Sequence, residues 1–143
     1  MLYLGVVGLT VNKNTVVHHA FISSPQVAAA KDQKLVSSGN PYVDAINTVR
    51  LESGLLPLLQ DGRLEELSLV RAKDMTNRVY YSLITPEGRD FSDYFEEVGL
   101  RSNLPSCENL LMQPSDDPDK AVKMWLSSDE HKACMLNSNY QKV

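Results

Sequence analysis

The chain has 143 residues, a length typical of one domain. Its hydrophobic content of 43% is that of a globular protein and excludes a disordered one. The formal net charge is −4, and no basic run is interleaved with aromatic residues, so the pattern excludes a nucleic-acid-binding protein.

The first eleven residues are apolar and uncharged. They are too few to span a bilayer, which needs about 20 apolar residues, and they lack the basic leader of a signal peptide. We interpret them as part of a truncated membrane anchor or signal, in preference to a strand-like apolar tail. Such a segment favours export to a secreted or cell-surface location, with a membrane tether at the N-terminus.

Residues 12–39 show little periodicity and are interpreted as a linker. We therefore divide the chain into an N-terminal segment with its linker, residues 1–39, and a folded domain, residues 40–143. His18 and His19 fall in the linker. Two imidazoles can bind a metal ion, but two exposed tail residues are the simpler interpretation.

Two helices are predicted at the start of the domain. Asn40 is a suitable cap for the first, with Pro41 in its first position, and Gly54 suits its end. Asp61 is expected to cap the second helix, in which apolar residues repeat at helical spacing up to about Tyr80.

Shorter elements follow a turn signal at residues 85–88. Asp90 is expected to cap a short helix, and residues 108–112 have the pattern of a strand. Helices are predicted from residue 117 to 125 and after Ser128, which is a suitable cap. Because a lone strand is not stable, residues 140–143 are expected to begin a second one.

Glu108 and His131 are the candidates for chemistry. A carboxylate and an imidazole can form an acid/base pair or part of a metal site. The expected position of His131 near a helix N-terminus favours the neutral imidazole that either role requires. Alternatively, Glu108 turns to solvent and His131 is a polar residue on a helix surface. Ser128 is interpreted as a cap rather than a nucleophile, because no Gly-x-Ser-x-Gly sequence surrounds it.

The two cysteines, Cys107 and Cys134, leave two interpretations open. An even number of cysteines in an exported protein permits a disulfide. Two separate, partly buried thiols are the alternative, because the sequence does not show the distance between the two residues.

A series of short motifs runs in a characteristic order through the domain. They are Asn47-x-x-Arg50, Gly54-Leu55-x-Pro57-Leu58, Asp61-x-x-Leu64, Arg71-Ala72-x-Asp74-Met75, Tyr81-Ser82-x-x-x-Pro86-Glu87-Gly88, Glu108-Asn109 and Trp125-x-x-Ser128-x-x-His131. Over residues 40–143 this order resembles the bacterial branch of the CAP superfamily, also called SCP-like extracellular domains, which includes the cysteine-rich secretory proteins.

The resemblance implies an α+β fold: an α-β-α sandwich, rich in helix, with a small central sheet that here lacks the family's closing strands. It also implies a cleft built from two histidines and two acidic residues, sometimes with a divalent metal such as zinc. Glu108 matches one acidic residue and His131 the second histidine. Ser128 stands at the other acidic position, as in many bacterial members, and Leu83 stands where the first histidine is expected.

Two consequences follow from the resemblance. A catalytic zinc site has three protein ligands plus water, whereas only Glu108 and His131 remain here, so we expect at most a weakly bound divalent metal. If the cleft brings Glu108 and His131 together, it also brings Cys107 and Cys134 together, which favours the disulfide.

The predicted function is that of a ligand-binding or interaction module with an incomplete cleft of Glu108, Ser128, His131 and Leu83. Its expected ligand is lipid-like, a glycan or a protein. The alternatives are a hydrolase, such as a peptidase, with His131 as general base and Glu108 as its partner, and a domain whose cleft residues serve stability alone.

Overall fold

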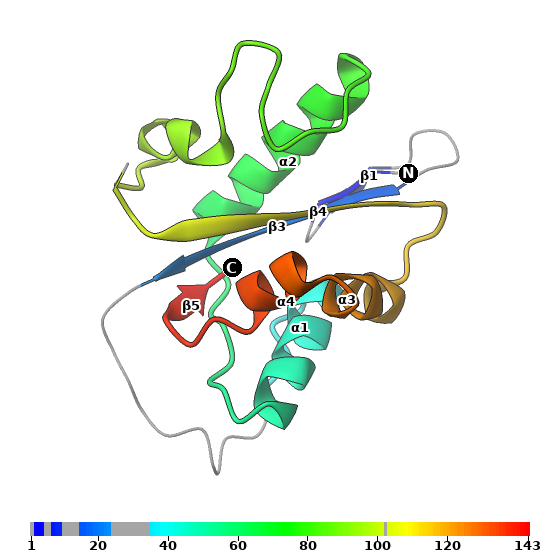
Figure 1. Ribbon diagram of the computed structural model, residues 1–143, viewed down its shortest axis with the longest axis vertical. Helices are drawn as coiled ribbons and strands as arrows, with labels where there is room; N and C mark the ends of the chain where they lie inside the picture. Colours follow the sequence, from blue (N-terminus) through cyan, green and yellow to red (C-terminus); the bar gives the residue numbers. More distant parts are fainter. Residues whose placement is uncertain (1, 5–6, 10–14, 24–34, 102) are drawn as a thin grey trace.

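The computed structural model describes residues 2–4, 7–9, 15–23, 35–101 and 103–143 (Figure 1). The described strands form one five-stranded sheet, and helices lie on both of its faces. The strands are β1 (Leu2–Leu4), β2 (Val7–Leu9), β3 (Thr15–Ser23), β4 (Ser106–Gln113) and β5 (Tyr140–Lys142). The helices are α1 (Pro41–Glu52), α2 (Gly62–Asn77), α3 (Pro118–Leu126) and α4 (Asp129–Met135), with short 3-10 helices η1 (Phe91–Tyr94) and η2 (Glu96–Val98).

The strand β3 is the centre of the sheet. It pairs antiparallel with β4 along nearly its whole length, from Thr15 opposite Gln113 to Ile22 opposite Ser106. On its other edge it pairs with β1, which is parallel, and with β5, which is antiparallel. The strand predicted at 108–112 and the one predicted to begin at 140 are therefore both present, and both pair with β3.

The position of β3 differs from the interpretation of residues 12–39 as a linker. Thr15–Ser23 form a strand, and Phe21 is fully buried in the main core. The strands β1 and β2 likewise belong to the sheet. A strand is stabilised by the partners against which it packs, and the partner of β3 lies some ninety positions further along the chain. The division between residues 39 and 40 stays a prediction.

The sheet separates two helical layers, as Figure 1 shows: α2 covers one face, and α1, α3 and α4 cover the other. Successive side chains of a strand point to opposite faces, and β4 follows this rule. Leu110 packs against Ala72 and Met75 of α2, whereas Leu111 belongs to the core on the other face. The α-β-α sandwich that the resemblance implied is thus confirmed.

Most of the buried apolar residues lie between the sheet and the layer of α1, α3 and α4. This main core contains Phe21, Tyr42, Val43, Ile46, Leu58, Leu111, Ala121, Val122, Trp125, Cys134, Met135, Tyr140 and Val143. A smaller core joins α2 to the two 3-10 helices and contains Leu64, Leu67, Phe91, Phe95 and Leu100. No helix within the described ranges is long and apolar enough to cross a membrane.

The helix caps predicted at Asn40, Asp61, Asp90 and Ser128 are present, and Asp117 caps α3 in the same way. The side chains of Asn40, Asp61, Asp90 and Asp117 each accept a hydrogen bond from a main-chain N–H in the first turn of the helix that follows. Such a bond satisfies one of the N–H groups that has no partner within the helix. Ser128 does the same for α4, with 3.5 Å between its Oγ and the nitrogen of His131.

Arg50 of α1 ties the main-core layer together. Its buried guanidinium donates hydrogen bonds to the carbonyl oxygens of Leu56, Met135, Asn137 and Tyr140. These carbonyls belong to the connector after α1, the end of α4, the following turn and the start of β5. Burial lowers the pKa of Arg50 to about 10, which leaves the side chain charged at neutral pH.

Asp61 joins the start of α2 to β5. Its carboxylate lies 2.7 Å from Nη2 of Arg63 and 2.9 Å from Nζ of Lys142. The hydrogen bonds from Arg63, followed by the contact with Lys142, hold the pKa of Asp61 well below its usual range. The chain around Leu59 runs parallel to β5 and adds a further pairing to the sheet there.

Candidate functional site

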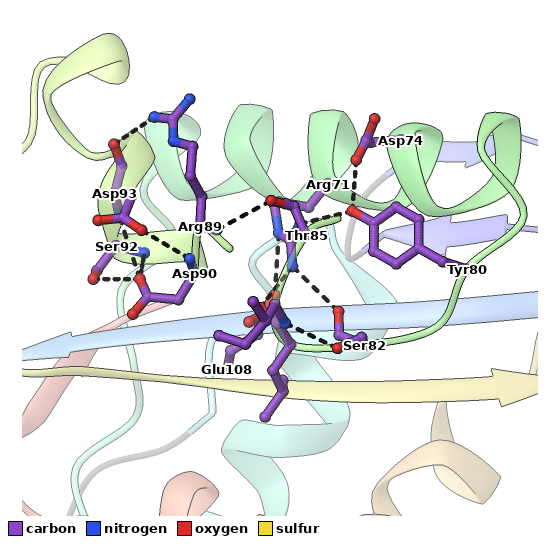
Figure 2. Close-up of polar contacts among 12 residues, drawn as sticks. Arg71, Asp74, Tyr80, Ser82, Thr85, Arg89, Asp90, Ser92, Asp93 and Glu108 are labelled. Carbon is purple, nitrogen blue, oxygen red and sulfur yellow. Dashed lines mark hydrogen bonds and ion pairs between the residues drawn. The ribbon is translucent and has the colours of Figure 1, made fainter. Parts of the chain in front are cut away.

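Glu108 lies on β4 and faces α2. Its side chain is 4% exposed, and its Oε1 is 3.5 Å from Nε of Arg71, whose side chain is 1% exposed. At this distance the contact is an ion pair rather than a hydrogen bond. Figure 2 shows the carboxylate of Glu108 directly beneath the guanidinium of Arg71.

The same guanidinium also holds the segment that follows α2. Nη1 of Arg71 donates to the hydroxyl of Tyr80 (3.0 Å), and Nη2 donates to the carbonyl oxygens of Ser82 (3.3 Å) and Leu83 (3.0 Å). One buried cation therefore joins α2, β4 and the chain at residues 80–83. We call Arg71, Glu108 and the carbonyls of Ser82 and Leu83 the arginine clamp.

Tyr80 extends this network towards α2. Its hydroxyl donates to Oδ2 of Asp74 at 2.5 Å while it accepts from Arg71. Burial, together with the bond to Asp74, raises the pKa of Tyr80 to about 12. The phenol therefore stays protonated at neutral pH and keeps both roles.

Four apolar side chains next to the clamp are exposed to solvent. Val79 is 89% exposed, Tyr81 and Leu83 are each 48% exposed, and Ile84 is 46% exposed. We call these four residues the apolar loop. Leu83, which stands where the resemblance places the first histidine, is one of these exposed residues.

The apolar loop is fixed at both ends. At its start, Val79 has a φ of +55°, and hydrogen bonds from Val79 and Tyr80 to carbonyls in the last turn close α2, as in a Schellman motif. Beyond Ile84, the predicted turn is present: the N–H of Gly88 donates to the carbonyl of Thr85. Arg78 and Glu87 pair across the two ends, and Arg78 holds the pKa of Glu87 below its usual value.

His131 lies in the first turn of α4 and is half-buried. Its main-chain N–H donates to the Ser128 hydroxyl, and its carbonyl oxygen accepts from Nδ2 of Asn109 at 3.0 Å. Ser128 acts as the helix cap that the sequence predicted. The hydrogen bond between His131 and β4 therefore involves the main chain of His131.

The hydrogen bonds and ion pairs of Glu108 and His131 connect them to different helical layers. Glu108 shares the α2 face of β4 with Leu110, whereas Asn109, which contacts His131, shares the opposite face with Leu111. Because side chains alternate along a strand, this arrangement lends no support to one cleft containing both residues, and that cleft stays a prediction.

The two cysteines form a disulfide, as the resemblance favoured. Cys107 of β4 and Cys134 of α4 have Cα atoms 6.0 Å apart, within the usual range for such a bond. The disulfide lies on the face that carries Asn109, and it fastens α4 to the sheet.

The described residues do not fit a metal site. No three His, Cys, Asp or Glu side chains within the described ranges are close enough together to hold a metal ion. Glu108 contacts α2, with a guanidinium beside it, whereas His131 belongs to α4. The side chains of His18 and His19 lie outside the described residues; their backbones stand on β3, opposite Leu110 and Asn109.

Sequence reasoning placed Arg71 in the motif Arg71-Ala72-x-Asp74-Met75 and on the repeating face of α2, but not among the candidate site residues. That position was the available signal: a charged residue on the same helical face as Leu64, Leu67 and Met75 must be buried with them, and a buried charge needs a partner. The partner, Glu108, lies in another element, so the pairing itself required the structure.

The arrangement defines a class: a three-layer α-β-α domain with one disulfide between the sheet and the last helix. Residues 43–143 match the CAP family, described as the cysteine-rich secretory protein family, and the chain belongs to this family.

Two curated relatives from Bacillus subtilis (strain 168) are similar to most of the chain. An uncharacterized membrane protein, YlbC, is 28% identical over 127 residues, which cover 87% of this chain and 36% of the relative. An uncharacterized protein, YkwD, is 26% identical over 121 residues, which cover 85% of this chain and 44% of the relative. The chain thus spans less than half the length of either, and both similarities extend upstream of Val43. No solved structure matches the chain.

Proposed function

We propose that this CAP domain is a non-catalytic binding module outside the cell or at its surface, and that it binds a lipid-like ligand on the apolar loop. The observation that carries the proposal is the exposure of Val79, Tyr81, Leu83 and Ile84 in one short segment. Neighbouring exposed apolar side chains favour contact with an apolar ligand.

The second support is the rigidity of the loop. The arginine clamp holds the carbonyls of Ser82 and Leu83, and Arg78 pairs with Glu87 across the base. A segment that is held in place before binding loses less conformational entropy when the ligand arrives. The loop is therefore suited to binding rather than only to covering a core.

The location outside the cell is supported by three observations. The family is described as secretory, and one relative is described as a membrane protein. The chain also carries a disulfide, a bond that persists in oxidising compartments.

The hydrolase alternative has less support. A general base needs its partner within hydrogen-bond reach, whereas Glu108 contacts α2 and His131 belongs to α4 in the opposite helical layer. A glycan is also less suited to the loop than a lipid, because most of the exposed side chains of residues 79–84 are apolar and only Tyr81 and Ser82 have a polar group.

A fluorescent fatty acid tests the proposal. We expect the wild-type protein to bind the probe saturably, and a Leu83→Ser/Ile84→Ser variant to bind it at least tenfold more weakly. Val36→Ser is the matched control, because Val36 is 83% exposed and precedes α1 on the other side of the sheet. His131→Ala should also bind as the wild type does. Equal affinity of the loop variant and the wild type would refute the proposal.

A further inference from the structure

We propose that the guanidinium of Arg71 is the built-in cation of this domain: it occupies the place beside Glu108 that a divalent metal would need, and it holds the apolar loop in position without one. Arg71 is then a positioning residue. The part of this inference that concerns ligand binding rests on the proposed function, whereas the part that concerns metal and loop order does not.

The groups around Arg71 are those that a hard cation would bind. They are a carboxylate, two main-chain carbonyls and a phenol oxygen, from Glu108, Ser82, Leu83 and Tyr80. Oxygen atoms of these kinds bind divalent cations in proteins. In this chain all four are directed at one guanidinium, whose planar set of donors can serve several acceptors at once.

The positive charge of Arg71 excludes a metal ion from the place beside Glu108. The side chains of Arg71 and Glu108 are 1% and 4% exposed, so water screens them little. A metal ion bound to Glu108 would stand next to a positive charge inside the protein, where like charges repel strongly.

Leu83 fits the same explanation. At this position the side chain supplies no metal ligand and is half exposed, while the main-chain carbonyl accepts from Nη2 of Arg71 at 3.0 Å. The residue therefore contributes to the cation site through its backbone and to the apolar loop through its side chain. Because the cation is a side chain of the protein itself, the same residue completes the cation site and holds the exposed side chain of Leu83 in place.

Zinc titration by calorimetry and amide hydrogen exchange together test the inference. For the wild type we expect no zinc binding that depends on Glu108, which a Glu108→Gln variant checks. In Arg71→Met, the amides of residues 80–85 should exchange at least tenfold faster, with α1 unchanged. Arg78→Met is the control: it removes the ion pair with Glu87 at the base of the same loop, and it should increase exchange less.

Two results would overturn the inference. One is stoichiometric zinc binding by the wild type that Glu108→Gln abolishes. The other is unchanged exchange at residues 80–85 in a folded Arg71→Met protein. If that variant does not fold, Arg71→Lys replaces it, because lysine keeps the charge but cannot reach all the acceptors. Amide exchange at residues 80–85 should then be faster in Arg71→Lys than in the wild type, and unchanged exchange would overturn the inference.

The same proteins separate this inference from the proposed function. Absence of fatty-acid binding by the wild type would refute the ligand proposal and leave the zinc and exchange results to decide the role of Arg71. If the wild type binds the fatty acid, EDTA should leave its affinity unchanged and Arg71→Met should weaken it. Loss of affinity on addition of EDTA would contradict the built-in cation.

Discussion

Replacing Arg50 by methionine should destabilise the fold by about 3–5 kcal/mol, the range for breaking a buried charged interaction. The side chain is 1% exposed, and its four hydrogen bonds to carbonyl oxygens are 2.6–3.1 Å long. Each hydrogen bond from a charged group contributes about 1.5–3 kcal/mol. Burying the charge costs several kcal/mol, so only part of the total remains as net stabilisation.

Methionine keeps most of the aliphatic length, so the expected loss comes from the carbonyls rather than from a large cavity. The carbonyls of Met135 and Tyr140 would remain in the core without their donor, and buried acceptors without partners are costly. Because small domains are stable by about 5–15 kcal/mol, the variant should be close to unfolding at 37 °C.

Urea unfolding followed by tryptophan fluorescence measures this loss. Trp125 is the single tryptophan and is fully buried in the core that Arg50 braces. Arg101→Met is the matched control, because Arg101 is exposed; it should change stability by less than about 0.5 kcal/mol. A loss below about 1 kcal/mol in Arg50→Met, the value of a single ordinary hydrogen bond, would refute the reasoning.

Three further substitutions have expected outcomes. The pKa of Asp61 is lowered in the fold, so its carboxylate contributes about 1–2 kcal/mol to the free energy of unfolding above about pH 4, and this contribution is lost as the pH falls further. Asp61→Asn should therefore flatten the acid side of a profile of stability against pH from 2 to 7. An unchanged profile would contradict this. Removing the disulfide with Cys107→Ser/Cys134→Ser should cost about 2–4 kcal/mol in urea unfolding, given its separation of 27 residues, and a reductant should affect only the wild type. Val79→Gly should stabilise the protein by about 0.5–1 kcal/mol, because a β-branched residue at positive φ is strained; a lower melting temperature would show that Val79 is not strained.

The helices could be predicted because their signals are local. Asn40 and Asp61 each accept a hydrogen bond within the turn that follows them, so their effect depends on a few neighbouring residues. The turn at residues 85–88 is local in the same way. The strand β3 could not be predicted by such signals, because its stability comes from pairing with a segment near the end of the chain.

The candidate site shows the same limit in a different form. The order of motifs correctly indicated the family and favoured the disulfide between Cys107 and Cys134. It could not show that Glu108 and His131 face different layers, because that depends on which face of β4 each helix covers. Nor could it pair Arg71 with Glu108, since a residue on the apolar face of a helix gives no sign of its partner.

The alternation along β4 explains how one strand serves two purposes. Cys107 and Asn109 fasten α4 to the sheet, whereas Glu108, between them, faces Arg71 and the loop that follows α2. The Glu-Asn pair is thus divided between two layers: the amide holds a helix, and the carboxylate fixes the cation that holds the apolar loop. A leucine at position 83 is compatible with this division, because the clamp uses only its carbonyl. The missing histidine therefore leaves the loop positioned and makes its exposed surface apolar.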